Sequence, residues 1–239
     1  MAELLRTQRL SKRFRGLIAN SDIDFTIAAG ELRCIIGPNG AGKTTFISMI
    51  SGHQRPTAGS IWFKERNITG LPVHSIARMG ILRKFQTPTV FDNLSVYENV
   101  ELAVLATDHP ARHRRERILE TLEMVRLTDL SGQTVGTLAH GQRQWLEIGM
   151  LLGGEAQLLL LDEPTAGMTA EETHATGELV RRLVRELQLS AIIIEHDINF
   201  IRELRAPITV LHLGRVLVEG TYADIAQNEQ VRSVYLGEA

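Results

Sequence analysis

The chain has 239 residues, which is enough for one sizeable hydrophobic core but leaves little for a second full domain. Its apolar content of 44% and charged content of 23% are ordinary for a soluble globular protein, and a net charge of −2 gives no overall attraction to nucleic acid or anionic lipid. The single cysteine, Cys34, excludes an internal disulfide and suits a reducing cytosol. No stretch approaches the roughly 20 apolar residues of a membrane span, and the opening MAELLRTQRLSKRF lacks the apolar run of a signal peptide.

The first third of the chain is predicted to form short strands and two helices. Alternating or continuous apolar residues bounded by turn residues predict strands at 4–9, at 21–36 with a turn at 29–30, at 59–63 and at 81–85. A helix at 46–50, closed by Gly52, and a short helix at 73–79 lie between them.

The rest of the chain alternates helices and apolar strands. Helical patterns cover 95–126, with an interruption near 108–110, and 141–152, and a loop at 129–137 lies between them. The elements that follow are strands at 158–161, 190–194, 208–212 and 216–219, a helix at 170–187 and small C-terminal helices. Apolar strands alternating with helices predict a parallel sheet covered on both faces. The helix-only stretch from about 92 to 150 is interpreted as a helical subdomain inserted into a single domain spanning 1–239.

The phrase GPNGAGKTT at residues 37–45 fits the pattern G-x-x-x-x-G-K-[ST]. It lies between a predicted buried strand and a predicted helix, so its backbone N–H groups and the helix dipole would form an anion site. Lys43 would reach the β- and γ-phosphates of a nucleotide, and the Thr44 hydroxyl would hold Mg²⁺. The loop alone leaves open whether the protein phosphorylates a substrate, switches a signal, or moves nucleic acid or a membrane protein.

The run LLLLDE at 158–163 supplies a second half of such a site. A buried strand delivers Asp162 to its C-terminal end, where α/β sheets bind ligands, and Asp162 would hold Mg²⁺ from the opposite side. Glu163 is placed to polarise an attacking water, so hydrolysis is favoured over transfer to a bound substrate.

The motifs LAHGQ at 138–142, DEPTAGM at 162–168 and IEHD at 194–197 complete a series that resembles the ATP-binding-cassette (ABC) ATPases over essentially all 239 residues. The resemblance implies an α/β P-loop NTPase with a RecA-like core, an N-terminal antiparallel β-subdomain and an inserted helical signature subdomain. ATP contacts are implied for Phe14, which would stack on adenine, for Gly37, Pro38, Asn39, Gly40, Ala41, Gly42, Lys43, Thr44 and Thr45, and for the signature residues Leu138, Ala139, His140, Gly141 and Gln142. It implies catalytic roles for Glu163, His196 and Gln86, and Mg²⁺ ligands at Thr44, Gln86 and Asp162.

The resemblance also implies a mechanism. Two cassettes pair head to tail around two ATP molecules, and each ATP is covered by the partner's signature helix.

The chain departs from the family pattern at Ala139, which replaces the signature serine, at His140, which replaces a glycine, and at Thr169, where Asp or Asn is usual. These departures bear on how well this chain's signature supports hydrolysis in the partner's site.

Two stretches, at 80–91 and 140–150, resemble the urea-type importer ATPase, a relative of the branched-chain amino-acid importer ATPases. We therefore expect an ATPase that drives import of urea or a small amide, with branched-chain amino acids as the alternative substrate. The expected partners are two transmembrane permease subunits, a second and different ABC ATPase, and indirectly an external substrate-binding protein. The expected location is the cytoplasmic face of the inner or plasma membrane, where Pro88, Val90 and Phe91 would contact a permease.

Other classes are disfavoured. DNA-repair cassettes separate the two halves of the site with a long coiled coil, and excision-repair cassettes carry zinc cysteines, which one Cys cannot supply. A small-molecule kinase would have no use for Glu163 or the signature. A soluble ABC ATPase in cofactor assembly stays open by fold, and no nucleic-acid partner is expected.

Overall fold

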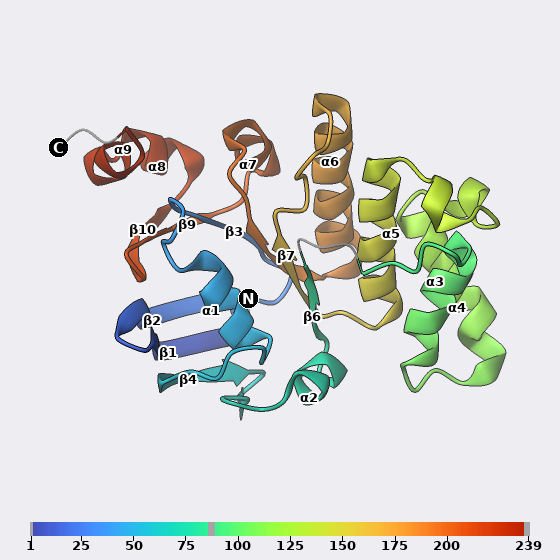
Figure 1. The fold of residues 1–239 in the computed structure, drawn as a ribbon, viewed down its shortest axis with the longest axis horizontal. Helices are drawn as coiled ribbons and strands as arrows, with labels where there is room; N and C mark the ends of the chain where they lie inside the picture. Colours follow the sequence, from blue (N-terminus) through green and yellow to red (C-terminus); the bar gives the residue numbers. More distant parts are fainter. Residues whose placement is uncertain (1, 86–88, 237–239) are drawn as a thin grey trace.

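The computed structural model describes residues 2–85 and 89–236, which form two sheets with helices around them (Figure 1). The smaller sheet is antiparallel, with strand order β2-β1-β4-β5. Its strands are β1 (Glu3–Phe14), β2 (Leu17–Ala28), β4 (Ala58–Phe63) and β5 (Arg66–Asn67). β1 is longer than the strand predicted at 4–9, because the polar residues that follow still pair with β2 through their backbones.

The larger sheet has six strands in the order β10-β9-β3-β8-β7-β6. All neighbours are parallel except β10, which runs antiparallel to β9 at one edge. The strands are β3 (Leu32–Ile36), β6 (Ile81–Lys84), β7 (Leu158–Asp162), β8 (Ser190–Ile194), β9 (Ile208–His212) and β10 (Arg215–Gly220). The predicted parallel sheet is confirmed, and the predicted turn at 29–30 separates β2 from β3.

The helices cover both faces of the larger sheet. They are α1 (Lys43–Ile50), α2 (Val73–Arg78), α3 (Val96–Leu105), α4 (Ala111–Met124), α5 (His140–Gly153), α6 (Ala170–Leu187), α7 (Ile198–Leu204), α8 (Tyr222–Gln227) and α9 (Glu229–Leu236), with 3-10 turns at Thr128–Leu130 and Val135–Thr137. The sequence patterns did not predict α7, whose first turn is held by Asp197 Oδ1 accepting from the N–H groups of Asn199 at 2.8 Å and Phe200 at 3.2 Å.

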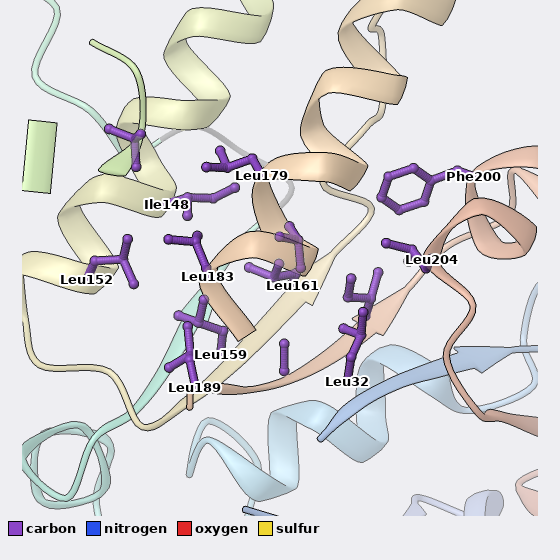
Figure 2. Close-up of a cluster of buried hydrophobic side chains, with 14 of the residues drawn as sticks. Leu32, Ile148, Leu152, Leu159, Leu161, Leu179, Leu183, Leu189, Phe200 and Leu204 are labelled. Atoms are coloured by element: carbon purple, nitrogen blue, oxygen red, sulfur yellow. The ribbon is translucent and has the colours of Figure 1, made fainter. Parts of the chain in front are cut away.

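One core lies between the larger sheet and helices α5, α6 and α7 (Figure 2). Leucines of β3 and β7 meet side chains from all three helices there: Leu32, Leu159 and Leu161 from the sheet, Ile148 and Leu152 from α5, Leu179 and Leu183 from α6, and Phe200 and Leu204 from α7. The strands β7 and β8 are buried along their whole length, which explains their unbroken apolar runs.

A second core lies on the opposite face of the larger sheet, where α1 is enclosed between the two sheets. Phe46 of α1 packs edge-on against Phe25 of β2, with 5.3 Å between the ring centroids. Because Ile47 and Ile50 are also fully buried, the helix and the loop before it are fixed in place.

Helices α3 and α4 lie beyond α5, far from the antiparallel sheet, and all three belong to the stretch between β6 and β7 (Figure 1). Ser95 begins α3 with a capping box, accepting from the N–H of Glu98 while Glu98 accepts from the N–H of Ser95. Among the residues that the structure describes, no helix is long and apolar enough to cross a membrane.

Candidate nucleotide-binding site

The strands β3, β8 and β7 are adjacent and parallel, so their C-terminal ends meet at one edge of the sheet. The segments that follow them begin at residues 37, 195 and 163. Ligands in α/β folds bind at this edge of the sheet. The topology therefore brings together three motifs that are far apart in the sequence.

The loop of residues 37–42 is shaped by its glycines. Gly42 has φ +97° at the N-terminus of α1, and a Cβ there would lie 2.4 Å from the Ala19 carbonyl oxygen. A Cβ on Gly37 would lie 2.2 Å from the Leu211 carbonyl oxygen. The first turn of α1 holds no acidic residue, and the first N–H groups of a helix have no partner within it. The loop is therefore a concave anion site of the kind that phosphates occupy.

Lys43 is buried, and its ammonium group lies inside this loop. Its Nζ donates to the carbonyl oxygens of Gly37 at 2.6 Å and Pro38 at 3.1 Å. Burial lowers the pKa of Lys43, while the nearby carboxylates of Glu163 and Asp162 act in the opposite direction. The amine is thus held within the anion site, near Asp162 at the end of β7 and Glu163 directly after it.

Asp162 ends β7 with its carboxylate almost wholly buried. Oδ2 accepts from Arg83 at 3.0 Å, and Arg83 also donates to Ser48 Oγ of α1 at 2.7 Å. Oδ1 has no hydrogen-bond partner among the described residues. Burial raises the pKa of Asp162, and the Arg83 guanidinium opposes that rise. A buried carboxylate oxygen left without a partner is a hard ligand suited to Mg²⁺.

The side chain of Glu163, the residue after Asp162, is paired with that of His196. His196 Nε2 lies 3.2 Å from Glu163 Oε1, and the side chains are 40% and 29% exposed, so a water can reach both. Glu163 has φ +49°, a left-handed conformation that strains a non-glycine residue. Its N–H donates to the Ile194 carbonyl oxygen at 2.9 Å, which holds the strained residue against the end of β8.

Glu195 joins two of the loops at this edge, and the sequence patterns assign it no role. Its buried carboxylate accepts from Thr165 Oγ1 at 2.5 Å, from the Thr165 N–H at 3.0 Å and from the His196 N–H at 3.0 Å. The one sequence feature that could have indicated Glu195 is its position directly before His196. Arg83 was also not predicted, because nothing in the sequence indicates its contact with Asp162.

The signature residues lie at the start of α5 and contact the segment that follows β7. His140 Nε2–H donates to the Ala166 carbonyl oxygen at 2.9 Å, and the Gly141 N–H donates to Glu172 Oε1 at 3.3 Å. Ala139, which has no hydroxyl to cap α5, is instead bonded through its N–H to Gln142 Oε1 at 3.0 Å. Leu138 is buried. Among the described residues no hydrogen bond joins 138–142 to the loop of 37–45.

Two further predicted residues stand apart. Phe14 lies at the end of β1, is 39% exposed, and has Lys12 Nζ 4.8 Å from its ring centroid. Its face is thus shared with a cation. Gln86 lies outside the described residues, so its predicted roles at the metal and the water stay predictions.

The glycine loop, the buried lysine and the paired acidic residues define a P-loop nucleotide-binding domain. Residues 20–166 match the family described as ABC transporter, and residues 215–239 match one described as branched-chain amino acid ATP-binding cassette transporter. The chain belongs to the ABC transporter ATP-binding family, which confirms the predicted enzyme class, since ATP hydrolysis is the activity expected of this family.

Several curated proteins are similar along their whole length. The high-affinity branched-chain amino acid transport ATP-binding protein BraF of Pseudomonas aeruginosa is 36% identical, with 99% of this chain and 98% of that protein covered. LivG of Escherichia coli, of the same description, is 34% identical over the same shares. The lipopolysaccharide export system ATP-binding protein LptB of Acidithiobacillus ferridurans is 36% identical, covering 100% and 98%. These names do not support the urea-type assignment and favour its alternative.

Solved structures agree with the fold. A crystal structure of the ADP conformation of an ATP-binding cassette of an ABC transporter is 26% identical, with a TM-score of 0.89 and 100% of each chain covered. A nucleotide-free ATP-binding cassette from an ABC transporter is similar at 26% identity, with a TM-score of 0.88 and coverage of 99% and 100%. The predicted fold class is confirmed.

Proposed function

We propose that this chain binds and hydrolyses ATP to drive the import of branched-chain amino acids. The observation that carries the proposal is the similarity to BraF and LivG along the whole chain, together with the match of residues 215–239 to a branched-chain amino-acid cassette family. The proposed unit is one ATPase domain of residues 1–239, in which about 92–150 form a helical subdomain.

The proposed nucleotide site uses residues from all three loops. The loop of 37–45 binds the phosphates through its N–H groups, and Lys43 turns from its own loop carbonyls to the β- and γ-phosphates. Thr44 and the free Oδ1 of Asp162 are the proposed Mg²⁺ ligands among the described residues. When bound, Mg²⁺ supplies positive charge to the phosphates of the nucleotide.

Hydrolysis requires an oriented water, and Glu163 is the proposed group that orients it. His196, 3.2 Å from Glu163, keeps that carboxylate in place and is available to the γ-phosphate. The strained backbone at Glu163 supports this assignment, because strain of this kind collects at functional sites. Phe14 is the proposed contact for adenine.

The proposed partners follow from the transporter family. The proposed partners in the membrane are two permease subunits, and the proposed permease contact on this chain is a groove of about 640 Å³ between α2, β6, α3 and α5. The chain would then be a peripheral protein on the cytoplasmic face of the membrane. Phe91, 53% exposed, is a proposed permease contact with Val90, whereas Pro88 lies outside the described residues. A second cassette would complete each nucleotide site with its signature residues, and a heterodimer is our proposal for the working complex. An external binding protein would deliver the substrate.

The proposal is tested by deleting the gene in its host and measuring uptake of labelled leucine and labelled urea side by side. Loss of leucine uptake, restored by the wild-type gene and not by Lys43→Ala, is the expected result. Loss of urea uptake alone would favour the urea-type importer that the stretches 80–91 and 140–150 resemble. If neither uptake changes, transport of both substrates is rejected, and an ATPase acting on soluble partners is the next hypothesis.

A further inference from the structure

Two successive residues of β6 carry buried positive charges, and each is paired with a carboxylate. Arg83 pairs with Asp162 at 3.0 Å, with 6% and 2% of the side chains exposed. Lys84 pairs with Glu147 of α5 through Nζ and Oε2 at 3.2 Å, with 1% and 3% exposed. Successive side chains of a strand point to opposite faces, so the two pairs lie on opposite sides of β6.

Glu147 is bonded to more than Lys84. Its Oε1 accepts from the Thr89 N–H at 2.6 Å. Lys84 Nζ in turn donates to the Phe85 carbonyl oxygen at 3.3 Å. The carboxylate on α5 therefore holds the last residue of β6 and the backbone of Thr89, and α5 cannot shift along the sheet without breaking a buried polar contact.

The pair of Arg83 and Asp162 also has further contacts. Arg83 donates to Ser48 on α1, the helix that follows the glycine loop, and its guanidinium carbon lies 4.9 Å from the centroid of the Phe85 ring. Asp162 has its other oxygen, Oδ1, without a partner among the described residues. A cation bound at Oδ1 would share the carboxylate of Asp162 with Arg83, which is bonded to Oδ2.

Stability alone does not account for this arrangement. Two apolar residues of similar volume are often as stabilising as a buried ion pair, whereas the loss of one partner leaves an uncompensated buried charge. What the ion pairs add is geometry, since each fixes two elements at a set distance. The elements joined are β7, β6 and α5, and α5 begins with the signature residues His140 and Gly141.

We propose that these two ion pairs form a relay, in which occupation of the metal site at Asp162 is transmitted through Arg83 and Lys84 to Glu147 and the signature helix. Arg83, Lys84 and Glu147 are positioning residues in it. The inference rests on the proposed function, because it takes Asp162 as a metal ligand. In a pair of cassettes the relay links the nucleotide site of one chain to the signature that this chain presents to its partner.

The test uses the full chain with Lys84→Met and Glu147→Leu combined, which replaces the ion pair by apolar side chains and avoids an unpaired charge. Circular dichroism and the thermal midpoint report whether the fold is kept, and a fluorescent nucleotide analogue reports binding. The measured response is the hydrogen–deuterium exchange of residues 140–146 with a non-hydrolysable ATP analogue, in Mg²⁺ and in EDTA.

In the wild type we expect Mg²⁺ with the analogue to change exchange at 140–146 by about fivefold or more, the lower end of usual coupling between sites, and the analogue in EDTA to do much less. The double variant should bind the analogue within about twofold of the wild type and lose the exchange response. Arg117→Met is the matched control: it removes a 2.9 Å bond from α4 to the Leu152 carbonyl oxygen of α5 but leaves the relay intact, so its response should stay.

A double variant that binds the analogue and keeps the response would overturn the relay, as would a wild type whose signature helix does not respond to Mg²⁺. If the double variant fails to fold, Lys84→Arg is measured instead, since it retains the positive charge. The relay predicts that Lys84→Arg keeps the exchange response, and loss of the response in this variant would overturn the proposal. A wild type that binds no nucleotide would reject the proposed function itself, which separates the two failures.

Discussion

The glycines of the phosphate loop differ in what surrounds them, and this difference yields a quantitative prediction. Gly40 and Gly42 have φ +79° and +97°, so an alanine at either position is strained by about 1–2 kcal/mol. A Cβ on Gly40 meets nothing within 4 Å. A Cβ on Gly42 would lie 2.4 Å from the Ala19 carbonyl oxygen and 2.5 Å from Asn20 Nδ2.

The Ala19 oxygen is backbone, so a side-chain rotation cannot relieve that contact. Asn20 is held as well, because its Nδ2 donates to the Gly42 carbonyl oxygen at 3.2 Å. Overpacking of this kind costs about 1–3 kcal/mol. We expect Gly42→Ala to lower the free energy of unfolding by about 2–5 kcal/mol and Gly40→Ala by about 1–2 kcal/mol.

The assay is urea unfolding of both variants without nucleotide, followed by circular dichroism. The wild type and Gly40→Ala serve as references, because Gly40→Ala carries the same kind of backbone strain without the steric contact. Equal losses of stability in the two variants would refute the reasoning, since they would mean that β2 and the loop separate at no cost.

The remaining predictions concern single side chains. Glu163→Gln should keep ATP binding and lower phosphate release in the assembled complex by about 10²-fold or more; unchanged turnover would reject Glu163 as the group that orients the water. Lys43→Ala should weaken binding of a fluorescent nucleotide by roughly 10-fold or more, as expected for lost charge-assisted hydrogen bonds, and an unaltered affinity would reject the loop assignment. Burial raises the pKa of the Cys34 thiol to about 12, so iodoacetamide at pH 8 should label it only in denaturant, as followed by mass spectrometry; labelling of the folded chain would contradict this. Because an unfolded thiol loses its proton above about pH 8.5, the free energy of unfolding should fall as the pH rises from there towards 12, and Cys34→Ala should reduce that fall in urea titrations.

The parts of the fold that sequence reasoning predicted well are those with strong local signals. The helix predicted at 170–187 has those bounds, because Thr169 and Glu172 form a capping box at its start. The buried strands β7 and β8 were predicted from unbroken apolar runs. The end of β1 was missed because its pairing with β2 is made by the backbone, and α7 was missed because its seven residues are too few for a clear period.

The residues of the candidate site also fall into those that the sequence predicted and those that it did not. The phosphate loop and the acidic pair were predicted because each motif is contiguous in the sequence, and the structure brings them to one edge of the sheet. Arg83, Glu147 and Glu195 were not assigned, because their importance depends on contacts with residues far away in the chain. Sequence patterns show the charge of such residues but not the partner that the fold provides.

The strand order has a consequence for how the protein is made. β3 ends at Ile36, yet its two neighbours in the sheet are β8, which starts at Ser190, and β9, which starts at Ile208. During synthesis the phosphate loop therefore emerges long before the strands that support it, and pairings of such long range are slow to form. A ligand that binds the folded chain and not the unfolded chain stabilises the folded state, so nucleotide bound at this edge of the sheet would favour chains that have finished folding.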